Sequence, residues 1–121
     1  MKVAVSSSGN TLEDALDMRF GRADCFLVVD TETMTFTVID NSARSNAGGA
    51  GIAAAQQVID SGAEALITGQ IGPNAMDVLK STDITLYQGV RKSIYDNIVA
   101  FNQKTLDPIA GSGPAHAGLR R

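Results

Sequence analysis

The chain has 121 residues, of which 44% are hydrophobic and 19% charged, and its formal net charge is −3. This size and composition are typical of one globular domain with its own core. No apolar run approaches the roughly 20 residues of a membrane span, and no signal-peptide pattern opens the chain. We therefore expect a cytoplasmic protein without a membrane partner. The acidic balance argues against nucleic-acid binding, which usually needs a basic face.

The chain contains one cysteine, Cys25, and one histidine, His116. Neither an intramolecular disulfide nor a closed zinc site of four Cys/His ligands is possible within one chain. A bound metal would need carboxylates, a site shared in a dimer, or ligands that arrive with the metal. Cys25 is either a soft-metal ligand or a small core residue at the start of a strand.

The first third of the chain predicts three strands. Residues 2–6 form a short apolar strand, and a long polar connection without clear periodicity runs from Ser6 to Asp24. Residues 25–30 are almost continuously apolar, which indicates a buried strand. Residues 34–39 alternate, so these two strands predict a hairpin.

The rest of the chain predicts two strand–helix units that follow a helix. The expected elements are a helix over 51–61, a strand over 65–68, a helix opening at Gly72-Pro73, a strand over 84–87, and a helix over about 91–104. Gly62 is a natural helix terminator, and Pro73 occupies a favoured first helical position. Residues 106–121 are rich in Gly, Pro and Ala and predict a disordered tail, so the folded domain is expected to span 1–105.

This order of elements predicts an α/β fold. Three strands form a meander, and right-handed crossovers place the last two strands parallel to the first. The simplest result is a mixed five-stranded sheet in the order 3-2-1-4-5, with helices on its faces in three layers. That sheet order is typical of ribonuclease H-like folds.

Ligands of open α/β sheets bind beyond the carboxyl ends of the parallel strands. The glycine-rich segment 46–51 directly precedes the first helix, where backbone N–H groups and the helix dipole attract anions. Its spacing matches neither a P-loop nor a dinucleotide fingerprint. The segment therefore indicates an anion or cofactor platform or, equally, a flexible loop that allows tight helix–sheet packing.

The charge distribution favours the anion site. Four arginines fall on the predicted edge, while Lys2, Lys80 and Lys104 fall on the opposite one. The four are Arg19, Arg22, Arg44 and Arg91. A basic edge on an acidic protein has the electrostatics of an anion site.

Enzymatic functions fit the sequence poorly. No histidine outside the tail is available for a catalytic triad. The centre of the first strand, Val3-Ala4-Val5, carries no acid, and only Asp24 and Asp40 fall near the edge. These are too few carboxylates for a metal-dependent nuclease.

Four segments together resemble the nitrogenase iron–molybdenum cofactor biosynthesis family. They are residues 3–7, 19–22, 46–51 and 67–75, and the resemblance extends over about residues 1–105. The chain looks most like the small stand-alone members, one of which holds a molybdenum–copper sulfide cluster. The resemblance implies a ribonuclease H-like fold without nuclease activity and a role in carrying or storing a metal–sulfur cofactor.

The resemblance also implies how such a cluster would be held. A thiomolybdate-type cluster is an anion that brings its own sulfide ligands, with Arg19 and Arg22 supplying positive charge. The expected cofactor-binding residues are Ser7, Arg19, Phe20, Arg22, Asn46, Gly48, Gly49, Gly51, Gly69 and Gly72, with Cys25 as a candidate metal ligand. The shortage of Cys and His favours a noncovalently held molybdenum–copper sulfide cluster over iron–molybdenum cofactor itself.

The leading hypothesis is thus a non-enzymatic carrier of an anionic metal–sulfur cluster, with a possible protein partner that delivers or receives it. The alternative is an interaction or regulatory module that binds no metal and docks a partner through the glycine edge and tail. A small-molecule phosphoryl or nucleotide binder is a weaker alternative, because no Walker lysine is present.

Overall fold

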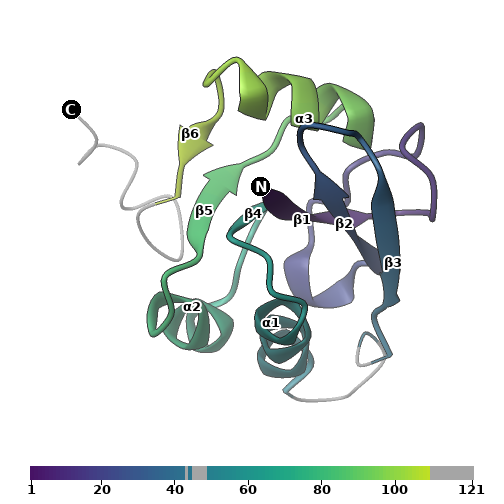
Figure 1. The fold of residues 1–121 in the computed structure, drawn as a ribbon. Coiled ribbons are helices and arrows are strands. Elements are labelled where there is room, and N and C mark those ends of the chain that lie inside the picture. The colour runs from purple at the N-terminus through teal and green to yellow at the C-terminus, as the bar shows by residue number, and fades with distance from the viewer. Residues whose placement is uncertain (43, 45–48, 110–121) are drawn as a thin grey trace.

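The computed structural model describes residues 1–42, 44 and 49–109 (Figure 1). Its elements are β1 (Lys2–Ser7), a 3-10 helix η1 (Phe20–Arg22), β2 (Cys25–Asp30), β3 (Phe36–Asp40), α1 (Ala50–Asp60), β4 (Ala65–Thr68), α2 (Pro73–Lys80), β5 (Thr85–Gln88), α3 (Ile94–Asn102) and β6 (Asp107–Pro108). Within the described part of the chain, no helix is long and apolar enough to cross a bilayer.

The strands form one mixed sheet in the order β3-β2-β1-β4-β5-β6. β1, β4 and β5 are parallel, and β2 and β3 run antiparallel beside β1 as a hairpin. The predicted α/β class and the order of the first five strands are confirmed.

The sixth strand was not predicted, because residues 106 onward were assigned to a disordered tail. Tyr87 pairs with Pro108 and Gln88 with Asp107. Leu106 is buried, and the Ile109 backbone N–H donates to the Leu86 carbonyl at 2.8 Å. A two-residue strand has no periodicity to detect, and its pairing with β5 depends on residues distant in the chain. Residues 110–121 lie outside the described residues.

Helices cover both faces of the sheet, which confirms the three layers (Figure 1). α1 and α2 lie on one face, and α3 lies on the other together with the segment around Leu16. Side chains alternate between the faces, since successive residues of a strand point in opposite directions. The first core contains Phe26, Leu66, Val58 and Leu79, and the second contains Leu27, Ile67, Ile94 and Ile98.

The connection between β1 and β2 is ordered, although its sequence predicts only a polar loop. Single-residue bridges join Ser7 to Leu16 and Arg19 to Gln70. The side chains of Leu16 and Phe20 are buried. Isolated bridges and single buried residues leave no repeating pattern, so periodicity could not reveal this folded-back segment.

Candidate functional site

The parallel strands β1, β4 and β5 all end at one edge of the sheet, which we call the carboxyl edge. The pairing register places Ser7, Cys25 and Asp40 in a row across β1, β2 and β3. Thr68 and Gln88 form the corresponding pair at the ends of β4 and β5. The strand ends and the connections after them therefore meet where the sequence predicts.

The helices α1 and α2 lie side by side (Figure 1), and their first turns meet at this edge. A Cβ added to Gly51 in the first turn of α1 would lie 3.2 Å from the Cβ of Ala75 in the first turn of α2. We call this region, residues 49–52 and 72–75, the paired helix starts. Glycine at position 51 therefore allows α1 and α2 to approach closely at their starts.

Within the described part of the chain, no side chain caps either of the paired helix starts. Neither Gly49 nor Gly72 can cap its helix, and neither first turn contains an acidic residue. In contrast, the Ser93 hydroxyl caps α3 by accepting from the Asp96 N–H at 3.0 Å. Because the first N–H groups of a helix have no partner within it, α1 and α2 present donors where α3 does not.

Three positions at the carboxyl edge are occupied by glycine, each for a different physical reason. Gly49 has φ 75°, in the left-handed region that disfavours a side chain. A Cβ on Gly69 would lie 2.3 Å from the Met18 carbonyl oxygen, so this glycine admits the neighbouring backbone. Gly72 has an ordinary φ of −68°, and a Cβ there would meet nothing within 4 Å. The fold does not require glycine at position 72, where its lack of a side chain keeps the start of α2 accessible.

Arg19 is exposed and paired with the buried carboxylate of Asp17. Its Nε and Nη2 donate to the two Asp17 oxygens at 3.1 and 2.9 Å, and its backbone N–H donates to Oδ1 at 2.9 Å. Burial of the Asp17 carboxyl opposes its ionisation. The hydrogen bonds and charge of Arg19 outweigh that effect and lower the pKa of Asp17 below its usual 3.8. Asp17 was not predicted as a site residue; the only sequence signal is its position two residues before Arg19.

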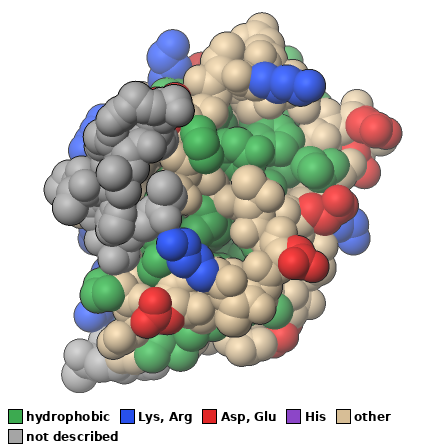
Figure 2. All heavy atoms as spheres, turned by 90° about the vertical axis from the view of Figure 1, so that its left-hand side faces the viewer, with side chains coloured by type: hydrophobic (Ala, Val, Ile, Leu, Met, Phe, Trp, Pro, Cys, Tyr) green, Lys and Arg blue, Asp and Glu red, His purple; other side chains and the backbone are tan. Residues whose placement is uncertain are grey.

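Arg22 and Arg44 also bind neighbouring groups. Arg22 Nη1 donates to the Arg44 carbonyl at 2.6 Å. Arg44 forms an ion pair with Asp40 at 3.3 Å and a longer one with Asp24 at 3.8 Å. On the side of the molecule shown in Figure 2, Lys and Arg side chains are scattered among acidic and apolar ones. Arg19 and Arg44 therefore lie at the carboxyl edge with carboxylate partners, and so they supply directed donors more than a large excess of positive charge.

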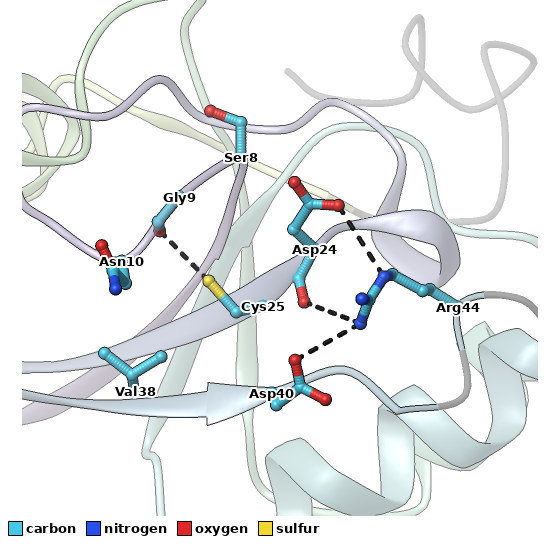
Figure 3. Close-up of a pocket in the computed structure, with 8 residues that line it drawn as sticks. All are labelled: Ser8, Gly9, Asn10, Asp24, Cys25, Val38, Asp40 and Arg44. Carbon is cyan, nitrogen blue, oxygen red and sulfur yellow. Dashed lines mark hydrogen bonds and ion pairs between the residues drawn. The ribbon is translucent and has the colours of Figure 1, made fainter.

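Cys25 lies in an open hollow of about 420 Å³ (Figure 3). The Cys25 hollow is lined by Ser8, Gly9, Asn10, Asp24, Cys25, Val38, Asp40 and Arg44. The thiol donates to the Gly9 carbonyl at 3.1 Å. Burial, followed by the charge of Asp24, raises its pKa, which keeps it protonated at neutral pH. Among the described residues, no group of three or more His, Cys, Asp or Glu could hold a metal ion.

Ser7 and Phe20 lie beneath the surface, as Gly69 and Cys25 do. Ser7 is fully buried, and its hydroxyl donates to the Gly9 carbonyl at 2.5 Å. Phe20 is 1% exposed, and its ring packs against Phe26 at a centroid distance of 5.3 Å. Both residues support the edge from below. Asn46, Gly48 and His116 lie outside the described residues.

The fold and its edge define a small three-layer α/β domain in which two neighbouring helices start at N-cap glycines without a side-chain cap. A sequence model of the family "Dinitrogenase iron-molybdenum cofactor" matches residues 1–104. The chain therefore belongs to the dinitrogenase iron–molybdenum cofactor family.

Individual relatives agree with this membership. An uncharacterised protein of Methanocaldococcus jannaschii is 31% identical over 110 residues, covering 88% of this chain and 90% of that protein. The apo form of the orange protein from Desulfovibrio gigas superimposes with a TM-score of 0.88 at 35% identity, over 93% of this chain and 96% of that one. A NifB-like protein from Thermotoga matches with a TM-score of 0.81 at 29% identity, over 93% and 97%.

Proposed function

We propose that this protein is a non-enzymatic carrier that holds an anionic metal–sulfur cluster noncovalently at the paired helix starts. The cluster contains molybdenum, and a molybdenum–copper sulfide is the specific candidate. A protein partner delivers or receives it. The observation that carries the proposal is the accessible, uncapped start of α2 at Gly72, directly beside the uncapped start of α1. Membership of a family named for the dinitrogenase cofactor supports the same class of ligand.

The chemistry of such a cluster suits the donors present. Each helix start contributes roughly 0.3–1 kcal/mol to holding a nearby anion, and up to about 2 kcal/mol in partly buried geometry. Pro73 has no N–H, so Asn74 and Ala75 provide the first-turn donors of α2. Because sulfide ions already complete the coordination of the metals, the protein needs hydrogen-bond donors and not metal ligands. Arg19 adds charge-assisted donors at the same edge.

Reconstitution tests the proposal directly. The protein is incubated with tetrathiomolybdate and a copper salt and then desalted, after which its visible spectrum and its molybdenum and copper contents are measured. We expect a coloured protein with both metals in a fixed ratio to the chain. A colourless, metal-free protein would overturn the proposal.

The Gly72→Asp variant tests the location. An aspartate at this N-cap would accept from the first-turn N–H groups and repel an anion, so cluster retention should fall about tenfold or more. Thermal stability should be maintained or raised, because Asp is a better N-cap than Gly. Gln103→Asp is the control for the added charge, since Gln103 is exposed, has an ordinary φ of −81° and lies at the end of α3, away from the carboxyl edge. Unchanged retention by Gly72→Asp would place the cluster elsewhere.

A further inference from the structure

The carboxylate of Asp17 is itself rigidly held. Its side chain is only 8% exposed, whereas that of Arg19 is 67% exposed. The Asp17 backbone N–H donates to the Ser6 carbonyl at 2.9 Å, and the Asp17 carbonyl accepts from the Ser6 hydroxyl at 2.7 Å. That hydroxyl also contacts Thr68 Oγ1 at 2.7 Å. Asp17 is thus fastened to the ends of β1 and β4, and the side chain it binds is fixed relative to the sheet.

Arg19 lies between the segments that lead into the two helices. Its backbone pairs with Gln70, just ahead of Gly72 and α2. The 3-10 helix that follows Arg19 approaches α1 closely, since a Cβ on Gly21 would lie 3.0 Å from the Cα of Gly51. The backbone of Arg19 therefore lies close to the segments that form the paired helix starts.

The pairing leaves part of the guanidinium for a ligand. A guanidinium carries five N–H donors in a planar fork. The Asp17 carboxylate accepts one hydrogen bond from Nε and one from Nη2. The donors on Nη1 and the second one on Nη2 lie on the far side of the planar group from Asp17.

We infer that Asp17 is a positioning residue for Arg19, which it holds so that the remaining guanidinium donors face an anion bound at the paired helix starts. The inference rests on the proposed function. An unpaired arginine would have to lose its rotamer freedom on binding the anion, whereas Asp17 fixes the side chain in advance.

The negative charge of Asp17 and its positioning of Arg19 should affect anion binding in opposite directions. A change at Asp17 can therefore show which of the two effects is larger. Asp17 neutralises Arg19, so removing its charge should strengthen anion binding if only electrostatics matter. If position matters more, the same change should weaken binding. Asp17→Asn is suited to the test, because its remaining oxygen can still accept from the Arg19 backbone N–H while the two-pronged side-chain pair is lost.

The experiment measures tetrathiomolybdate–copper cluster affinity in the wild type, Asp17→Asn, Arg19→Ala and the double variant. We expect Asp17→Asn to weaken binding roughly three- to tenfold, in line with the cost of ordering one long side chain. In the Arg19→Ala background the same change should have little effect, because the side chain that it positions is absent. Asp83→Asn, at the opposite edge of the sheet, is the control for loss of one carboxylate.

Arg19→Lys provides a second measurement that does not depend on altering Asp17. Lysine keeps the positive charge but has no planar fork, so we expect it to bind the cluster as weakly as Asp17→Asn does. Three results would overturn the inference: tighter binding by Asp17→Asn, an equal loss in both Arg19 backgrounds, or wild-type affinity in Arg19→Lys. A wild type that binds no cluster would instead remove the proposed function, and the inference with it.

Discussion

Cys25, Asp24 and Asp40 surround an open hollow at the β2–β3 end of the carboxyl edge, whereas α1 and α2 begin without side-chain caps further along it. The hollow contains the residue types usually associated with metals, but both carboxylates share an ion pair with Arg44 and the thiol is hydrogen-bonded to a carbonyl. The paired helix starts contain mainly glycine and alanine, and neither N-cap residue supplies a side-chain hydrogen bond to the first-turn N–H groups. For a ligand that brings its own sulfides, available donors matter more than metal-binding side chains.

The largest expected effect concerns the support beneath the paired helix starts. Phe20→Ala removes a fully buried ring that packs on Phe26, and we expect it to lower the free energy of unfolding by about 3–5 kcal/mol. Chemical denaturation followed by circular dichroism measures this loss. A variant with wild-type stability but poor cluster retention would instead show that Phe20 contacts the cofactor directly.

Gly69→Ala should have the next largest effect, because its Cβ would collide with the Met18 backbone. Displacing that backbone disrupts the Arg19–Gln70 bridge, at a cost of roughly 1–3 kcal/mol in stability. Cluster retention should fall as well, since Arg19 moves with its backbone. Gly72→Ala is the matched control for stability, because its Cβ enters open space; an equal loss in both variants would refute the packing role of Gly69.

The Cys25→Ser variant tests whether the cluster binds in the Cys25 hollow. Serine can still donate to the Gly9 carbonyl, so we expect a stability loss of only about 1 kcal/mol. Cluster retention should remain at the wild-type level, because the donors that hold the cluster lie at the paired helix starts. Metal analysis after desalting is the measurement, and a colourless Cys25→Ser protein would move the site to the hollow.

The smallest effect is the pH dependence of the Asp17–Arg19 pair. Since the folded-state pKa of Asp17 is lowered, its stabilisation is present above the unfolded value near 3.8 and is lost as the pH falls through the lower folded-state pKa. At neutral pH we expect the wild type to exceed Asp17→Asn in unfolding free energy by about 1 kcal/mol, because one partner is exposed to solvent. Urea titrations at neutral and acidic pH should show the difference shrinking below pH 3.8; a constant difference would mean that the pair contributes nothing as ions.

The parts of the fold that the sequence predicts are the helices and strands with a regular pattern of residues. The apolar run 25–30, the alternation before Asp40 and the glycine–proline start at 72–73 predict the strands and α2 because each pattern spans several residues. The β6 pairing and the folded-back segment around Leu16 escaped prediction because single residues, held by partners distant in the chain, produce them.

The amino-acid sequence by itself determined the sheet order and the edge at which the candidate residues meet, since hydrophobic periodicity and right-handed crossovers are local and general constraints. Only the tertiary structure decided which residues at that edge remain available to a ligand. It paired Arg19 with Asp17 and Arg44 with Asp40, buried Phe20, and left the start of α2 open at Gly72. These outcomes depend on distances between segments far apart in the chain, and no local pattern encodes such distances.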